Sequence, residues 1–215
     1  MDMVSERTES QKWKKAGLAA IAGAVAGFAA SMAFLLGTDE FGGVLSESAK
    51  IAGIVAIIYI LTSLMVGVGL VSPGFGVRFL NVEDRSELRE QRTLLAYSAA
   101  SILALGSGLL LVVLSGPGGT FGPDIGLIAV PLVAIGLVLG IRQWRYADEL
   151  MRTVSHESAA TAFYLLFAIG GGWAILAHLE YLAPPATLDW LSMIWAAGLF
   201  GSFIASARRG LLAPR

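Results

Sequence analysis

The sequence predicts an all-α membrane protein with six transmembrane helices, arranged as three helical hairpins. Hydrophobic residues make up 56% of the 215 residues and charged residues 14%, against about 25% charged residues in soluble domains. The apolar residues fall into six runs, most of them close to the ~20 residues that a helix needs to cross a bilayer. The basic residues collect in every second connecting segment, as a chain with alternating spans requires.

We expect a single transmembrane domain covering residues 1–215. A cleaved signal peptide competes for the first apolar run, but the run is too long for a signal core and no Ala-x-Ala pattern follows Leu36. Ser72-Pro73-Gly74 ends the second run, since proline and glycine do not continue a helix cheaply. The predicted spans are 16–36, 51–71, 94–114, 125–141, 158–177 and 190–207.

Glycines within the spans predict where helices approach each other closely. Two GxxxG pairs lie in the first and fourth spans, and a run of three glycines lies in the middle of the fifth. Small residues at such spacing allow close packing of helix backbones in a membrane. The predicted helix-packing residues are Gly23, Gly27, Gly136, Gly140, Gly170, Gly171 and Gly172.

The distribution of charge predicts the orientation of the protein. With alternating spans, the N-terminus, residues 72–93, residues 142–157 and the C-terminus share one side, and they hold every Lys and Arg except Lys50. The positive-inside rule makes that side cytoplasmic. We therefore expect both termini inside the cell, in the inner (cytoplasmic) membrane of a bacterium.

The segment Asn81–Arg92 is the most distinctive charged stretch. Asn81 is placed to cap a helix, and no glycine or proline follows before Gly106. We therefore expect one continuous helix from about residue 82 to 114, near 50 Å long and longer than a ~30 Å hydrocarbon core. Its cytoplasmic part would carry two charged faces. The acidic face holds Glu83, Glu87 and Glu90, and the basic face holds Arg85, Arg89 and Arg92.

Two interpretations of this extension stay open. Its arginines could contact lipid phosphates, at about 1 kcal/mol each near an anionic leaflet. Alternatively, the two faces form a docking surface for a cytosolic protein. A second cytoplasmic helical extension is predicted at 145–157, and Arg152 would join the extension at 81–93 in binding a partner.

Few groups remain for chemistry. No cysteine is present, so disulfides and thiolate metal sites are excluded. His156 and Glu157 lie at the inner edge of the fifth span, and His178 and Glu180 lie at its outer edge. We expect Glu157 to pair with Arg152 or Arg92 rather than to carry protons. We predict no metal site, no cofactor and no enzymatic activity, because no catalytic motif occurs and no charged group lies mid-span.

Several strings resemble a family of uncharacterised bacterial multi-pass inner-membrane proteins. They are Leu80-Asn81-Val82-Glu83-Asp84, Glu87-Leu88-Arg89-Glu90-Gln91-Arg92, Asp148-Glu149-Leu150-Met151-Arg152 and Arg208-Arg209-Gly210-Leu211-Leu212. Proteins of this kind are sometimes paired with small helix-turn-helix regulators. The resemblance thus implies a regulatory partner, without assigning functional residues.

The sequence as a whole predicts a non-enzymatic sensor or tether. It would sit in the lipid bilayer and bind a cytosolic protein, with a transcription regulator as one candidate, and would not bind nucleic acid directly. The alternatives are a small-solute channel or carrier, with Pro131 and Gly170–Gly172 as helix interruptions, and a structural subunit of a membrane complex. The GxxxG pairs also allow a homo-oligomer.

Overall fold

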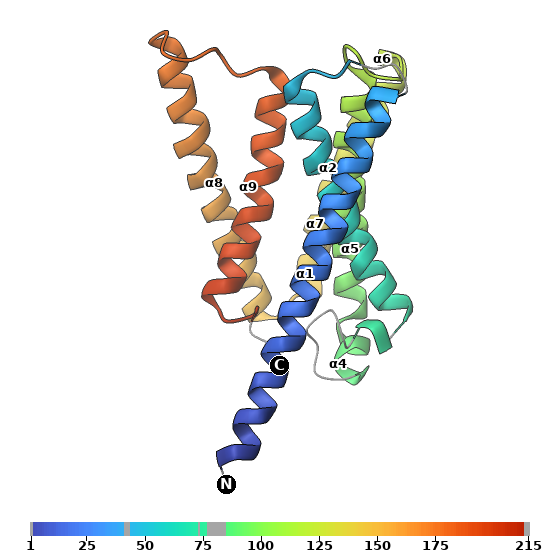
Figure 1. Cartoon of the computed structure of the whole chain (residues 1–215), viewed down its shortest axis with the longest axis vertical. Helices are drawn as coiled ribbons and strands as arrows, with labels where there is room; N and C mark the ends of the chain where they lie inside the picture. The colour runs from blue at the N-terminus through green and yellow to red at the C-terminus, as the bar shows by residue number, and fades with distance from the viewer. Residues whose placement is uncertain (1, 41–43, 73, 77–84, 213–215) are drawn as a thin grey trace.

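A computed structural model describes residues 2–40, 44–72, 74–76 and 85–212, and all regular structure in these ranges is helical. Six helices are long and apolar enough to cross a membrane, which confirms the predicted number of spans. The helices run side by side along the long axis of the molecule (Figure 1). Their bounds are α1 Asp2–Glu40, α2 Glu47–Val71, α4 Arg85–Glu90, α5 Arg92–Ser115, α6 Pro123–Gly126, α7 Ala129–Arg142, η1 Gln143–Arg145, α8 Glu149–His178 and α9 Thr187–Arg208.

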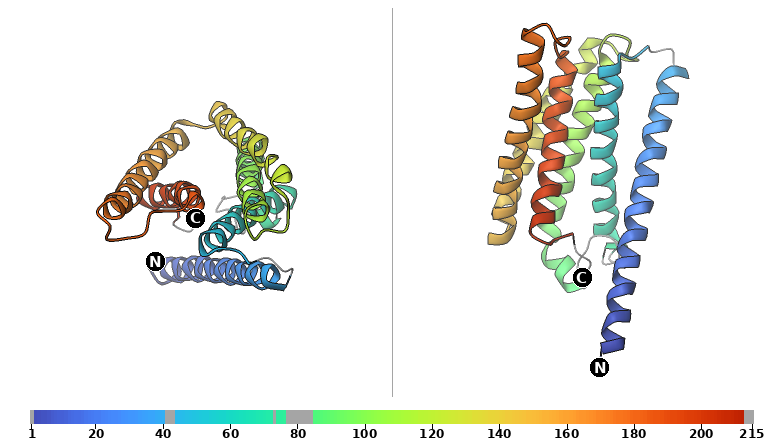
Figure 2. Two further views of the ribbon diagram at one scale, coloured as in Figure 1. Left: turned by 90° about the horizontal axis from the view of Figure 1, so that it is seen from above. Right: turned by 60° about the vertical axis from the view of Figure 1, so that its left-hand side comes forward.

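The spans form an open arc in the order α8, α9, α2, α5 and α7, with α1 against the outside of α2 (Figure 2). The predicted hairpins α5/α7 and α8/α9 pack closely. The most extensive packing joins α2 to α5, however, and so crosses the boundary between two hairpins. Helices α1 and α8 are the least buried spans, and α5 is the most buried.

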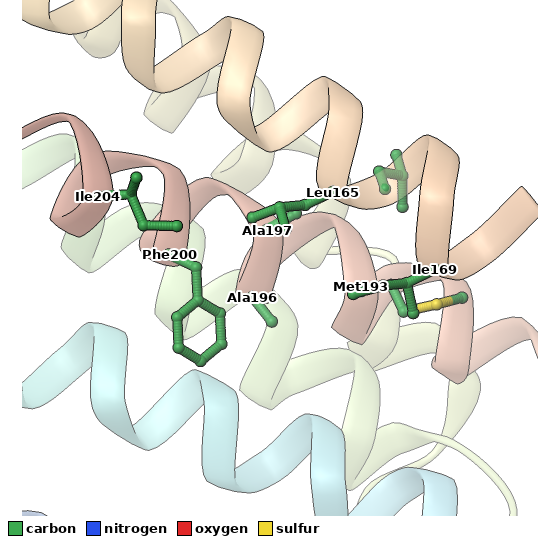
Figure 3. A pocket seen from close by; sticks show the side chains of 8 residues that line it. Leu165, Ile169, Met193, Ala196, Ala197, Phe200 and Ile204 are labelled. Carbon is green, nitrogen blue, oxygen red and sulfur yellow. The ribbon is translucent and has the colours of Figure 1, made fainter.

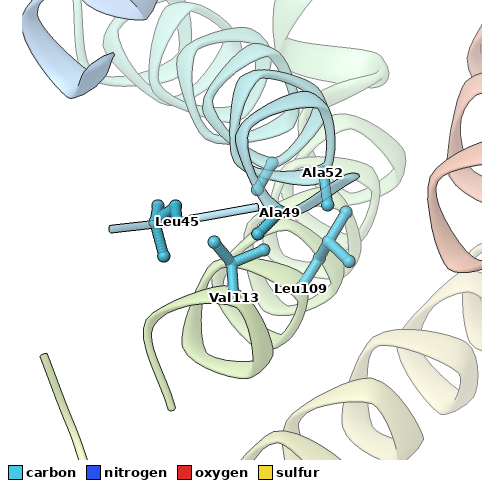
Figure 4. Packing of buried hydrophobic residues seen from close by; sticks show 6 residues of the cluster. Leu45, Ala49, Ala52, Leu109 and Val113 are labelled. Carbon is cyan, nitrogen blue, oxygen red and sulfur yellow. The ribbon is translucent and has the colours of Figure 1, made fainter. Parts of the chain in front are cut away.

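The core lies between α2 and α5 and is built from small side chains (Figure 4). Ala52 and Ala56 of α2 are fully buried, as is Val113 of α5. A Cβ atom on Gly106 of α5 would lie 2.8 Å from the Cβ atom of Tyr59. The two backbones approach closely because Ala52, Ala56 and Gly106 carry little or no side chain.

Two of the predicted packing glycines, Gly136 and Gly140 on α7, lie against α5. A Cβ atom at Gly136 would lie 2.8 Å from Leu105, and one at Gly140 would lie 3.1 Å from the hydroxyl of Ser101. The other GxxxG pair differs, because nothing within 4 Å would meet a Cβ atom at Gly23 or Gly27 in the part of the chain that is described.

Helix α1 meets α2 closely at one point near the other end. The ring of Phe34 fills the space that a side chain on Gly53 would take. Gly23, Gly27 and Phe34 share one face of α1 at helical spacing. The small-residue face of α1 is therefore turned towards α2, but it is not filled there.

Helix α8 remains continuous through its three glycines. Trp190 of α9 lies over Gly170, where a Cβ atom would come within 2.9 Å of the indole ring, whereas Gly171 and Gly172 face open space. The closest contact with α9 is made instead at Gly201, where a Cβ atom would lie 2.5 Å from the carbonyl oxygen of Ser158. Two glycines, one near each end, thus set the distance between α8 and α9.

Two of the predicted helices are interrupted. The fourth span consists of the short helix α6 followed by α7, with Pro131 in the first turn of α7, where a missing N–H is tolerated. The predicted continuous helix 82–114 is wrong: the chain bends at Gln91, which separates α4 from α5. The predicted cap Asn81 lies outside the described residues.

The charged residues divide the bundle into two ends. The start of α1, the whole of α4 and the end of α9 lie at the same end of the bundle (Figure 1). We call this the basic end, and the opposite end, which carries Glu47, Asp124, Glu180 and Asp189, the acidic end. Helix α1 would be about 58 Å long at 1.5 Å per residue and projects beyond the other spans at the basic end.

Close packing at Gly201 can be tested by adding one methyl group. We expect Gly201→Ala to lower the free energy of unfolding by about 1–3 kcal/mol, since the new Cβ atom must displace the α8 backbone. The matched control is Gly172→Ala, which adds the same group where nothing lies within 4 Å. It should leave stability unchanged or raise it by up to ~1 kcal/mol. Unfolding in mixed micelles, followed by circular dichroism, measures both, and equal losses would contradict the assigned contact.

Candidate functional site

The charged surface predicted to bind a partner lies at the basic end, on and around α4. Leu88 anchors this short helix, because its side chain is only 4% exposed and lies against Gly76, just after α2. Arg89, Glu90 and Arg92 are exposed, and none of them forms an ion pair with another residue that the structure describes. Leu88 thus faces the bundle, and Arg89 and Glu90, which follow it on α4, lie at the surface beside it.

The two charged faces are only partly present. Glu83 lies outside the described residues, and the structure describes the backbone but not the side chain of Arg85. Glu87 is half-buried, and its carboxylate accepts a hydrogen bond of 3.1 Å from the side chain of Gln91. The bend at Gln91 places Arg92 on α5, so the predicted six charges do not share one straight helix.

The second predicted extension, 145–157, forms the start of α8 only from Glu149 onward. The carboxylate of Asp148 accepts a hydrogen bond of 2.6 Å from the backbone N–H of Met151 and so caps the helix. Arg145 and Arg152 are exposed on either side of this cap. They add two more cations to the basic end.

Two ring contacts hold the segment that joins α7 to α8. The rings of Tyr97 on α5 and Tyr146 stack with centroids 5.4 Å apart. Trp144 lies against His156 of α8, also with ring centroids 5.4 Å apart. His156 is therefore part of a structural contact between the joining segment and α8.

Glu157 pairs with Arg209, which makes the predicted pairing with Arg152 or Arg92 wrong. The Nε atom of Arg209 donates a hydrogen bond of 3.1 Å to one carboxylate oxygen of Glu157, and a terminal guanidinium nitrogen donates to the other. The Glu157 carboxylate raises the pKa of the Arg209 guanidinium, through the hydrogen bond and its negative charge. This two-point contact ties the end of α9 to α8.

The other two polar edge residues lie at the acidic end. His178 is the last residue of α8, and Glu180 follows in a turn with a positive φ of 62°. His156 and His178 therefore lie at opposite ends of one helix. Within the described residues, no group of three or more His, Cys, Asp or Glu side chains is placed to hold a metal ion.

Polar contacts inside the membrane join the spans to one another. The hydroxyl of Tyr59 on α2 donates to the carbonyl oxygen of Trp195 on α9 at 2.8 Å, and the indole N–H of Trp195 donates to the carbonyl oxygen of Leu105 on α5 at 3.2 Å. Ser63 donates to Ala99 and Ser101 donates to Gly136, each at 2.7 Å. Neither Tyr59 nor Trp195 was identified as such a partner from the sequence.

An apolar groove runs between α8 and α9 (Figure 3). It has a volume of about 210 Å³. All of its lining side chains are apolar, and Phe200 and Ile169 are 59% exposed. The lining residues are Leu165, Leu166, Ile169, Met193, Ala196, Ala197, Phe200 and Ile204.

The Tyr59 hydroxyl can be removed with little change in shape. We expect Tyr59→Phe to lower the free energy of unfolding by ~0.6 kcal/mol and by at most ~1.7 kcal/mol, the range of interhelical hydrogen bonds in membranes. Tyr164→Phe is the control, since that side chain is 68% exposed and has no hydrogen bond to a described residue. Unfolding in mixed micelles measures both, and an equal effect at both positions would contradict a structural role for the Tyr59 bond.

Comparison with known proteins found no relative of this chain. No family model matches the chain, and no curated protein and no solved structure matches it either. The resemblance to bacterial inner-membrane proteins paired with regulators therefore stays a prediction. Any function has to be argued from the membrane helices and from the charged surface at the basic end.

Proposed function

We propose that this protein is a non-enzymatic membrane sensor or tether that binds a soluble partner at its basic end. The observation that carries the proposal is the exposed set Arg89, Glu90 and Arg92, which lies next to Leu88, the buried residue that anchors α4. Exposed charges on an anchored element supply electrostatic complementarity and raise association rates with a partner of matching charge. Arg145 and Arg152 extend the same surface.

The chemistry of the spans favours a tether over a carrier. The six spans contain no Asp, Glu, Lys, Arg or His in their middle thirds, whereas ion and proton paths normally use such groups. The groove between α8 and α9 is lined by apolar side chains alone. It offers a polar solute no hydrogen-bonding group.

We further propose that the basic end faces the cytoplasm of a bacterium, across the inner membrane. The support is the collection of Lys and Arg residues at that end, with Lys50 as the exception. The partner would then be a cytosolic protein. The resemblance noted above favours a small transcription regulator.

The orientation can be tested with single cysteines, because the chain has none of its own. Asp124→Cys at the acidic end should react with a membrane-impermeant maleimide in intact spheroplasts. Arg89→Cys should react only after the membrane is permeabilised. Both positions are exposed, so a lack of reaction reports the compartment and not burial. Labelling of Arg89→Cys in intact cells would invert the orientation and would remove the cytosolic partner.

Partner binding can be tested by reversing charge on α4 and the start of α5. We expect Arg89→Glu together with Arg92→Glu to reduce recovery of the co-purifying soluble protein by roughly tenfold or more, since like charges across an interface cost several kcal/mol. Cross-linking and mass spectrometry of protein purified in mild detergent measure the recovery.

The matched control reverses two charges at the acidic end, Glu180→Lys and Asp124→Lys, which are also exposed. This variant should recover the same partner in wild-type amounts. If the wild type recovers no soluble protein, or if both double variants lose it equally, the charged surface is not a specific docking site.

A further inference from the structure

We propose that the groove between α8 and α9 binds one acyl chain of an anionic phospholipid, whose phosphate is held by Arg208. The site is separate from the α4 surface and does not depend on the function proposed above. It joins an apolar groove to a cation at the groove's end.

The groove is apolar throughout, and its length is close to the depth of one membrane leaflet. Its α9 side is formed by Met193, Ala196, Phe200 and Ile204, and all of its lining is apolar (Figure 3). Met193 and Ile204 are about 16 Å apart along a helix that rises 1.5 Å per residue, and half of a ~30 Å hydrocarbon core is about 15 Å. A chain whose headgroup lies at Arg208 would enter the groove about 6 Å further in, at Ile204, and would follow it past the middle of α9.

Among the described residues, only those of α8 and α9 line the groove. Helix α8 packs mainly on α9, and α9 packs on α8 and α2. The glycine contacts at Gly201 and Gly170 bring α8 and α9 together near the two ends of the pair. In a membrane, an apolar concavity open to the side is filled by lipid hydrocarbon.

An exposed cation, Arg208, lies just beyond the basic end of the groove. Arg208 follows Ile204 by four residues on α9, so it lies one turn further towards the basic end on nearly the same face. It is exposed and forms no hydrogen bond or ion pair with another described residue. The nearby carboxylate, Glu157, is bound at two points by Arg209.

Arg208, Arg209 and Glu157 together leave a net charge of about +1 near the basic end of the groove. An arginine at the headgroup level attracts an anionic lipid and can bind its phosphate through two N–H groups. The combination of chain and charge selects an anionic phospholipid over a zwitterionic one with the same chains. It places the lipid in the leaflet at the basic end.

The test uses the full-length protein in detergent, with native mass spectrometry as the measurement of bound lipid. Phosphatidylglycerol and phosphatidylcholine with identical acyl chains are added in equal amounts. We expect the wild type to retain phosphatidylglycerol about fivefold better, from about one cation at the membrane surface. Arg208→Gln should lose this preference. Arg142→Gln removes a cation from α7 at the same end of the bundle and should keep it.

A second variant tests the chain-binding part of the site. Ala196→Phe puts a ring into the groove and should reduce retention of both lipids severalfold, without changing the preference between them. Equal retention of both lipids by the wild type would overturn the proposal. So would equal loss in the two arginine variants, or unchanged retention by Ala196→Phe. If Ala196→Phe does not yield folded protein, the two arginine variants decide the outcome.

Discussion

The structure depends on the close approach of α2, α5 and α9 near the middle of the membrane. Lipid offers no hydrophobic force between helices, so packing and hydrogen bonds must hold them together. Gly106 lets α5 approach α2, and there Tyr59 bonds to the carbonyl oxygen of Trp195 while Trp195 bonds to that of Leu105. These two bonds link three spans that come from three different hairpins, and the remaining spans pack around this centre.

Most of the fold could be predicted from the sequence, because hydropathy and helix length act locally. The six predicted spans agree with the observed helices to within a few residues at most ends. The pairing of spans could not be predicted in the same way. The contact between α2 and α5 depends on Ala52, Ala56 and Gly106 meeting across two hairpins, and nothing in either helix alone specifies the other as its neighbour.

The candidate site was less predictable, since tertiary contacts decide it. A helical wheel places six charges on one straight helix, but the chain bends at Gln91, which leaves Glu87, Arg89 and Glu90 on α4 and Arg92 on α5. Arg152 and Arg92 were the arginines expected to pair with Glu157. It pairs instead with Arg209, which is 52 residues away in the sequence. The two GxxxG pairs also differ. Gly136 packs closely on α5, whereas no described atom lies within 4 Å of a Cβ atom placed at Gly23. Only the three-dimensional neighbours distinguish these cases.

The attachment of α8 to the rest of the bundle through α9 connects the two proposals. This helix packs mainly on α9 and carries Arg152 at the basic end, while Arg89 and Arg92 are held by α4 and α5 on the other side of the arc. The distance between these cations therefore depends on how α8 sits against α9. An acyl chain in the groove contacts both helices, and the Glu157–Arg209 pair joins them beside it. A change in the surrounding lipid would then act on the spacing of the same charges that we propose for partner binding, which is a physical route from membrane composition to a cytosolic protein.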